Sequence, residues 1–330
     1  MIAQTMLAIE IRAAGGPEVL QATTRPTPVP GPGQVLIRVR YAGVNRHDCG
    51  QRKRGFGPVG ATDIPGLEVS GEVAALGQGV KRWKVGDALC ALVNGGGYAE
   101  YCLAQEALCL AIPEGFTLQL AAALPEALLT AWFNVFYIGR LEPHQWLLVH
   151  GGSSGVGSLA IKLAVLLHSK VIATVGNEAK RAFCLSIGAS EAINYRNEDF
   201  VKRVHDITQG KGVNVILDMV GGAYAKRNIE ALAMDGRVMQ LSSGESDKYS
   251  VPLAAIMAKR VLIGGSQLRA SSLETKIKLI ADIEQKVGSH LGRSVLPVID
   301  SEFALIEASQ AHQRMETSEH VGKIILSINP

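Results

Sequence analysis

One segment near the middle of the chain constrains the fold more than any other part. The apolar run Trp146–His150 leads into the sequence GGSSGVG at residues 151–157, and an apolar helical pattern follows. Gly155, Gly157 and Ala160 fit the G-x-G-x-x-G/A spacing of dinucleotide-binding turns. Glycines let the backbone approach phosphates closely, and a helix N-terminus offers unpaired amide donors at the positive end of its dipole. The layout suits a pyrophosphate, although an ordinary strand-to-helix turn has the same local signature.

The residues on both sides of this turn alternate between strands and helices from about residue 126 onward. Five or six apolar strands separated by helical segments predict a parallel, doubly wound α/β sheet. This context favours the dinucleotide interpretation over the ordinary turn. The expected strands are Trp146–His150, Lys170–Val175, Glu191–Asn194, Val213–Asp218, Gly236–Leu241 and Val261–Gly264.

Residues 1 to about 125 have a different pattern, rich in short strands and turns. Val35–Arg40 alternates apolar and polar residues, as a half-buried strand does. Glu68–Leu76 and Asp87–Val93 are further strand candidates. These segments predict an irregular, mostly antiparallel, barrel-like domain.

The change of pattern divides the chain into two domains and a returning segment. We expect the barrel-like domain at 1–125 and the doubly wound domain at 126–265. Residues 266–330 contain two helical stretches and a final strand at Gly322–Ile328. We expect this last part to return to the first domain.

Composition excludes several classes of function. The net charge is only +3 and no stripe of Lys and Arg stands out, so we expect no nucleic-acid partner. The five cysteines have no CxxC spacing, which indicates reduced thiols in a cytoplasmic setting. Pro125, Glu126 and Asn134 interrupt the apolar stretch Leu118–Gly139, so we interpret it as a buried helix and not as a membrane span.

The end of the second expected strand discriminates between dinucleotide cofactors. NAD usually requires an Asp or Glu there to bind the ribose 2′-hydroxyl, and Ala173–Gly176 contains no acid. Lys180 and Arg181 follow, and both supply the cations that a 2′-phosphate requires. NADPH is therefore favoured. The alternatives are that both cations lie on a solvated helix face, or that Glu178 binds the hydroxyl of NAD.

A set of short motifs spread over essentially the whole chain identifies a family. The chain resembles the zinc-independent quinone oxidoreductases of the medium-chain dehydrogenase/reductase superfamily. Within them it is most similar to the inducible NADPH:quinone oxidoreductase branch, with zeta-crystallin a more distant relative. The resemblance implies a Rossmann doubly wound parallel sheet inserted in a GroES-like, mostly antiparallel β catalytic domain. The motifs are Gly15–Glu18, Asn45–Asp48, Gly66–Gly71, Gly95–Ala99, Pro125–Thr130, His150–Gly157, Ile193–Tyr195 and His320–Lys323.

The resemblance also implies where the cofactor binds, in a cleft between the domains. It places Gly155, Val156 and Gly157 at the pyrophosphate, and it provides a second argument for NADPH through Tyr195. It further implies a homodimer, which we expect to pair through the edge strand near Val261–Gly264. The complete set of expected cofactor-binding residues is Thr130, Ser154, Gly155, Val156, Gly157, Gly176, Lys180, Tyr195, Ser242, Ser266 and Leu268.

The ligands of the zinc-bearing relatives have no counterparts in this chain. Asn45 stands where those relatives have Cys, and Leu67 stands where they have His. The segment Gly95–Tyr98 is too short for their four-cysteine lobe. Zinc requires soft N and S ligands, so we expect no metal. Glu68 is then best interpreted as a buried packing or hydrogen-bonding residue.

Without a Lewis acid, the acceptor must itself take a hydride readily, and quinones and activated enones both qualify. We expect hydride transfer from the nicotinamide C4, with Asn45 as a candidate donor to the developing oxyanion. A structural Asn in a turn is the alternative. His47 is a candidate proton donor by analogy with the alcohol dehydrogenases, or else a structural histidine. Phe56 is the candidate substrate-stacking residue, where many relatives carry Tyr.

Two other functions stay open at this point. An enone or alkenal reductase uses the same fold and the same hydride, and fold analogy does not separate it from a quinone reductase. A catalytically idle NADPH-binding protein, acting as a lens-type structural protein or an RNA-binding partner, is the third possibility. The near-neutral charge argues against RNA.

Overall fold

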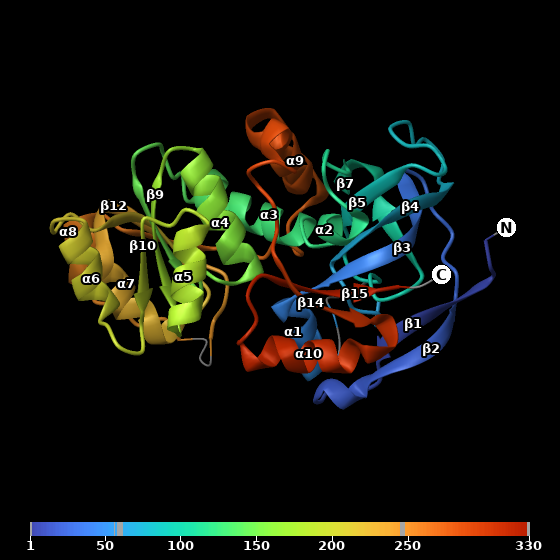
Figure 1. Ribbon diagram of the computed structural model, residues 1–330, viewed down its shortest axis with the longest axis horizontal. Helices are drawn as coiled ribbons and strands as arrows, with labels where there is room; N and C mark the ends of the chain where they lie inside the picture. The colour runs from blue at the N-terminus through green and yellow to red at the C-terminus, as the bar shows by residue number, and fades with distance from the viewer. Residues whose placement is uncertain (1, 56, 58–61, 245–247, 329–330) are drawn as a thin grey trace. The chain divides into compact units, whose positions relative to one another are not determined.

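The computed structural model describes residues 2–55, 57, 62–244 and 248–328. The chain forms two compact units, and the second is inserted into the first along the sequence (Figure 1). The first unit consists of Met1–Ala127 and Val287–Pro330, and the second is Leu128–Lys286. The sequence patterns place the return to the first domain at 266, whereas the contacts place it at Val287. Helix α9 (Leu273–Val287) accounts for the difference, because it belongs almost entirely to the second unit. Its Asp282 accepts a hydrogen bond from the indole of Trp132 in the same unit.

A six-stranded parallel sheet in the order β10-β9-β8-β11-β12-β13 forms the centre of the second unit. Figure 1 shows helices α4 to α8 around strands β9, β10 and β12. The strands are β8 (Trp146–His150), β9 (Lys170–Val175), β10 (Glu191–Asn194), β11 (Val213–Asp218), β12 (Leu232–Gln240) and β13 (Leu262–Gly265). The helices are α4 (Gly155–Leu166), α5 (Glu178–Ser186), α6 (Phe200–Ile207), α7 (Ala225–Ala231) and α8 (Leu253–Lys259).

This order is the doubly wound, Rossmann-type arrangement, and the fold expected from the sequence is confirmed. The chain reverses direction of winding between β8 and β11, so the loops at their carboxyl ends diverge and leave a crevice for a ligand. The glycine-rich turn follows β8 at this point. β12 begins four residues earlier than expected, at Leu232 instead of Gly236.

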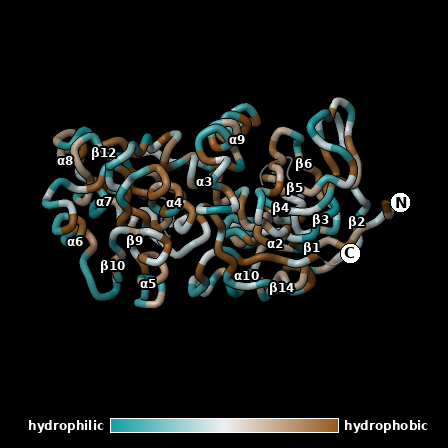
Figure 2. Tube along the Cα trace, turned by 45° about the horizontal axis from the view of Figure 1, so that its top comes forward, coloured by the Kyte–Doolittle hydropathy of each residue, from teal (hydrophilic) through white to brown (hydrophobic). Residues whose placement is uncertain are grey.

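Apolar side chains from consecutive strands form the core of this unit. Leu148, Ile172 and Ile216 are fully buried from the three central strands, and Phe200 of α6 packs in the same cluster. In Figure 2 the tube is largely brown, and therefore apolar, along α4, while teal polar segments occur along the outer helix α6. Burial of this kind stabilises a fold by roughly 25 cal/mol per Å² of apolar surface.

The first unit is built on a seven-stranded, mostly antiparallel sheet, as expected for a barrel-like domain. Its strand order is β14-β15-β3-β4-β5-β7, with β6 paired to β3, and β1 and β2 form a separate pair. The strands are β1 (Thr5–Ile11), β2 (Leu20–Pro26), β3 (Gln34–Val44), β4 (Glu68–Leu76), β5 (Ala88–Leu92), β6 (Tyr101–Gln105), β7 (Cys109–Ala111), β14 (Ile299–Ala304) and β15 (Lys323–Ser327). The helices are α1 (Arg46–Arg54), α2 (Leu118–Ala122), α3 (Pro125–Trp132, which continues into the second unit) and α10 (Ala308–Thr317).

The apolar stretch Leu118–Gly139 and the strand β14 compare differently with the sequence-based expectation. In the apolar stretch Leu118–Gly139, the buried helix expected after a proline start is α3, which begins at Pro125 and continues as a π-helix at Phe133–Ile138; the short helix α2 precedes it. β14 was not expected, since its sequence IDSEFA is too polar to show a strand pattern. No helix within the described ranges has the length and apolar content needed to cross a bilayer.

Candidate active site

The glycine-rich turn of the second unit has the geometry of a phosphate cradle. Ser154 is the N-cap of α4, and its Oγ accepts a hydrogen bond of 3.0 Å from the N–H of Gly157. A Cβ on Gly157 would lie 2.4 Å from the carbonyl oxygen of Gly151, so only glycine fits. Val156, the second residue of the helix, is partly exposed, whereas Gly155 and Gly157 are buried. The first turn of α4 therefore combines glycine residues with the N–H groups that any helix N-terminus leaves without an intrahelical partner, which fits a pyrophosphate.

A chain of buried hydrogen bonds links the carboxyl ends of β9, β8 and β11. Thr174 Oγ1 lies 2.9 Å from His150 Nδ1, and His150 Nε2 lies 2.9 Å from Asn228 Oδ1. Asn228 Nδ2 donates to Asp218 Oδ2 at 2.8 Å, so the Asn228 oxygen is the acceptor from His150. The imidazole proton is therefore assigned to Nε2, and Nδ1 accepts from Thr174. Burial lowers the pKa of His150 and outweighs the opposite effect of Asp218, which keeps the ring neutral.

Asp218 at the end of this chain fixes the loop after β11. Its Oδ1 accepts from the N–H groups of Val220 at 2.6 Å and Gly221 at 3.1 Å. Its Oδ2 accepts from Asn228 and from Gln240 Nε2, at 2.8 and 2.9 Å. The Ser154 hydroxyl donates a hydrogen bond of 3.5 Å to the sulfur of Met219 in this loop. The glycine-rich turn and the loop after β11 are therefore held together.

The end of β9 collects the residues expected at an adenosine 2′-phosphate. A Cβ on Gly176 would lie 2.8 Å from the Tyr195 hydroxyl and 3.7 Å from Arg196 Nε. Arg196 is exposed and was missed by the sequence analysis, although it follows Tyr195 directly. Lys180 lies in the first turn of α5 and is only 9% exposed. Burial raises the pKa of Cys184 to about 12, and the positive charge of Lys180 opposes this shift.

The other charged residues of this region are engaged with one another. Arg181 lies 3.6 Å from Glu178 and 3.8 Å from Glu198. Glu178 also accepts a hydrogen bond of 2.9 Å from Asn194 Nδ2. Arg181 is thus neutralised by two carboxylates, and Arg196 lies closer to Gly176 as a second cation.

The remaining expected cofactor residues lie at two other places in the second unit. Asn134 of the π-helix donates to the carbonyl oxygen of Thr130 and accepts from the Ser266 hydroxyl, both at 2.8 Å, so it links these two residues. Ser242 is exposed and its Oγ accepts from the N–H of Gly244 at 3.0 Å. Leu268 is 5% exposed and packs within the unit.

In the first unit, Asn45 belongs to a buried cluster with two ionised side chains. Lys323 Nζ lies 2.5 Å from both Asn45 Oδ1 and Glu68 Oε1. Asn45 Nδ2 donates to the same Glu68 oxygen at 3.0 Å, and the N–H of Glu126 donates to Glu68 Oε2 at 2.8 Å. Glu68 is fully buried and Lys323 is 4% exposed. Glu68 is therefore a hydrogen-bonding residue as expected, but its partnership with Lys323 was not foreseen.

A second buried network lies beside this cluster. Asp48 accepts from the N–H groups of Asn45 at 2.8 Å and Gly66 at 3.1 Å. The Tyr98 hydroxyl lies 3.4 Å from Asp48 Oδ2 and 3.1 Å from His312 Nε2. Burial lowers the pKa of His312 to about 3, so this ring is neutral. The first turn of α1 is thereby fixed with Asn45 at its N-terminal end.

The other two expected catalytic or substrate residues are less defined by contacts. His47 is half-buried in the first turn of α1. Phe56 lies outside the described residues. Within the described ranges, no three side chains of His, Cys, Asp or Glu are close enough together to hold a metal ion.

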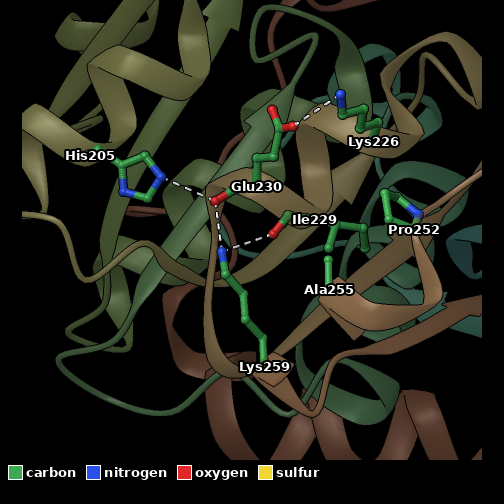
Figure 3. Close-up of a pocket in the computed structure, with 7 residues that line it drawn as sticks. All are labelled: His205, Lys226, Ile229, Glu230, Pro252, Ala255 and Lys259. Atoms are coloured by element: carbon green, nitrogen blue, oxygen red, sulfur yellow. Dashed lines mark hydrogen bonds and ion pairs between the residues drawn. The ribbon is translucent and has the colours of Figure 1, made fainter. Parts of the chain in front are cut away.

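A surface pocket of about 280 Å³ on the second unit is separate from these residues (Figure 3). Its cations are used within the fold. Lys259 Nζ donates to the carbonyl oxygens of Ile229, Glu230 and Leu232 at 2.8 to 3.0 Å, and His205 Nε2 lies 3.1 Å from the Glu230 oxygen. Both side chains therefore cap the carboxyl end of α7.

Comparison with known proteins gives the family. The model of the alcohol dehydrogenase GroES-like domain matches residues 31–114, and that of the zinc-binding dehydrogenases matches residues 155–282. The quinone oxidoreductase of Rattus norvegicus is 33% identical over 325 residues, which cover 97% of each chain. The chain belongs to the quinone oxidoreductase family of the medium-chain dehydrogenase/reductase superfamily. It is an oxidoreductase with a GroES-like domain and a Rossmann-type domain.

Two solved structures of this superfamily bear on the cofactor. A mycobacterial protein complexed with NADPH is 28% identical, with a TM-score of 0.86, and the match covers 98% of this chain and all of the other. An NAD-dependent alcohol dehydrogenase is 30% identical, with the same TM-score and coverage. This chain therefore shares its fold with proteins described with either cofactor.

Proposed function

We propose that this chain reduces quinones with NADPH as the hydride donor and without zinc. The observation that carries the proposal is the phosphate cradle at Ser154 and Gly157, in a chain of the quinone oxidoreductase family. When bound, the reduced nicotinamide supplies a hydride from C4. The chain binds the pyrophosphate at the first turn of α4, and Thr130, Ser266, Ser242 and Leu268 line the nicotinamide side.

The preference for NADPH rests on cations beside the end of β9. Lys180, Arg196 and Tyr195 supply the charged and hydroxyl donors that a 2′-phosphate requires. Glu178 is bound to Asn194 and Arg181, which disfavours its use as a ribose ligand. The mycobacterial relative complexed with NADPH supports the same choice.

On the acceptor side, Asn45 donates a hydrogen bond to the oxygen that gains negative charge. Its amide is held by Lys323 and Glu68, and it is 9% exposed. His47, two residues further along α1, supplies the proton that completes the reduction, and Phe56 stacks on the quinone. The pH dependence of turnover in His47→Asn tests the proton donor, since an unchanged profile removes it.

The experiment that tests the function compares two cofactors and two acceptors. Oxidation of NADPH and of NADH is followed at matched concentrations with 1,2-naphthoquinone and then with an alkenal. Fast loss of NADPH with the quinone alone supports the proposal. Turnover with the alkenal alone indicates an enone reductase, whereas tight NADPH binding without turnover of either acceptor indicates an idle binding protein.

Substitution of the cations tests the cofactor assignment. We expect Lys180→Ala and Arg196→Ala each to raise the KM for NADPH by roughly 10- to 100-fold, the effect of one charge-assisted hydrogen bond, with little change for NADH. Arg181→Ala is the matched control, because its charge is already engaged by Glu178 and Glu198. An equal rise for NADH would instead indicate a general loss of structure.

We also propose a homodimer that forms through the edge of the six-stranded sheet. β13 is the last strand in the order and exposes Leu262 and Ile263 at 55% and 40%, and Met257 of α8 is 64% exposed. An exposed apolar edge strand pairs readily with a second copy. Sedimentation should give twice the chain mass of 35.1 kDa for the wild type and a single chain mass for Ile263→Lys. The five buried free cysteines suit a reducing compartment such as the cytoplasm.

A further inference from the structure

Lys323 is a cation buried in the candidate acceptor site, where the proposed chemistry uses it only to hold Asn45. Its Nζ is 2.5 Å from Glu68 Oε1, and its side chain is 5% exposed while that of Glu68 is fully buried. Replacing such an ion pair by apolar residues is often neutral or stabilising, so stability alone is weak grounds for its presence. The position of the ammonium relative to Asn45 suggests another reason.

The two ends of the Asn45 amide are in different environments. Its Oδ1 accepts from the Lys323 ammonium at 2.5 Å. Its Nδ2 donates one hydrogen to Glu68 Oε1 at 3.0 Å. The second hydrogen is directed to the carbonyl oxygen of Gly43. The distance from Nδ2 to this oxygen is 3.5 Å, which is beyond the usual range for an N–H···O bond. The amide orientation is thus fixed, and one N–H remains weakly used.

We propose that Lys323 is a positioning residue that orients and polarises the Asn45 amide, so that its second Nδ2–H bond is the donor to the acceptor oxygen. This inference rests on the proposed function. A cation on Oδ1 draws electron density from the amide nitrogen and makes its hydrogens better donors, since hydrogen bonds in a chain strengthen one another in a low dielectric. Glu68 keeps the nitrogen end in place through the first hydrogen.

The surrounding backbone is shaped for this arrangement. A Cβ on Gly43 would lie 2.2 Å from Glu68 Oε1, so a glycine is required for the carboxylate to reach this position. The N–H of Glu126, near the N-terminus of α3, holds the other carboxylate oxygen. Glu68 cannot turn away from Lys323 and Asn45 without losing these contacts.

The competing explanation is that the ion pair only stabilises the fold. Lys323→Met combined with Glu68→Gln separates the two explanations, because it removes both charges together and leaves no buried ion unpaired. Lys323→Met alone should lower the Tm by roughly 5 to 10 °C, and the double variant should recover most of this loss. A structural role predicts that kcat recovers with the Tm.

We expect the double variant to regain stability and to keep a kcat for quinone that is roughly tenfold or more below the wild type. The loss should grow along a series of substituted naphthoquinones as the reduced oxygen becomes more basic, because such acceptors depend more on the donor. The dissociation constant of NADPH should not change. Wild-type kcat and an unchanged substituent dependence in the stable double variant would overturn the proposal.

Three controls keep the result interpretable. Lys323→Arg retains the charge and should keep the wild-type substituent dependence, and a dependence equal to that of the double variant would count against the proposal. Lys276→Met removes another buried lysine, bonded to the carbonyl oxygen of Arg269 in the second unit, and should leave the substituent dependence unchanged. Failure of the proposed function itself is recognised separately, as a wild type that does not turn over quinone.

Discussion

The two units bury a carboxylate in opposite ways. In the first unit, Glu68 is compensated by a full positive charge, the ammonium of Lys323 at 2.5 Å, together with two neutral N–H donors from Asn45 and Glu126. In the second unit, Asp218 is compensated by four neutral N–H donors, two from the backbone and two from the amides of Asn228 and Gln240. Both carboxylates are fully buried.

The difference shows what each site depends on. The buried ion pair of the first unit has one charged partner on each side, and the loss of either partner leaves the other charge without a counter-charge. A carboxylate held by several neutral donors loses only part of its stabilisation when one donor is removed. We therefore expect a single substitution at the Glu68 site to cause a large loss in the free energy of unfolding. We expect single substitutions in the Asp218 network to cause smaller losses.

The largest expected effect comes from removing Glu68. Glu68→Leu leaves the Lys323 ammonium buried without its counter-charge, and we expect a loss of about 3 to 5 kcal/mol in the free energy of unfolding of the first unit. Hydrogen exchange of β3 and β4 measures it in the unit concerned. A loss below that of Asp218→Asn would contradict the contrast between the units.

Asp218→Asn should have a smaller effect. The amide keeps one acceptor oxygen, while its NH2 group faces donors that the carboxylate had satisfied, so we expect a loss of about 2 to 3 kcal/mol in the second unit. Urea unfolding with hydrogen exchange of β11 and β12 measures it. Because Asp218 also fixes the loop against the Ser154 turn, the KM for NADPH should rise with it.

The neutral histidines sharpen the comparison through pH. The pKa of His312 is about 3 in the folded protein and ordinarily near 6.5, so between these values the unfolded state binds more protons. Stability that His312 contributes above pH 6.5 is therefore lost as the pH falls towards 3, by about 1.4 kcal/mol per pH unit in that window. Urea unfolding at pH 6.5, 5.5 and 4.5 should show a shallower decline for His312→Gln. The pKa of His150 is also lowered, but it is present in both proteins and cancels in the difference.

The smallest expected effect is at the far end of the Asp218 network. Thr174→Val removes the hydroxyl that donates to His150 Nδ1 and keeps the β-branched shape on β9, so we expect a loss of about 1 kcal/mol. Thermal unfolding compared with Thr174→Ser, which keeps the hydroxyl, isolates the hydrogen bond. A loss as large as that of Asp218→Asn would show that the network behaves as one unit.

Much of the second unit could be predicted because its information is local. Each strand is a short apolar run between glycine-rich or polar turns, and the phosphate cradle is one continuous segment at 151–157. The first and last residues of the elements were predicted less accurately. At β12, for example, the strand pairs with β11 before the apolar pattern of the sequence begins. Arg196 was not predicted as a site residue, because only the fold brings its side chain close to Gly176.

The cluster in the first unit could not be predicted from local pattern. Asn45 and Lys323 are 278 positions apart in the sequence, and Glu68 and Lys323 are 255 apart. Lys323 is the first residue of β15, and the apolar residues that follow it explain the strand without a functional role for the lysine. The pairing of β15 with β3 brings it to Asn45, and no periodicity or spacing in the sequence contains that information.

The inserted arrangement of the units also determines the order in which the protein is completed on the ribosome. The second unit ends at Lys286, so it emerges whole while the first still lacks β14 and β15. Until β15 is made, Glu68 has no ammonium beside it and β3 has one edge without its partner. The nascent first domain therefore keeps an unpaired strand edge and an uncompensated carboxylate until β15 is translated, and we expect chaperones that shield strand edges to bind it during this interval.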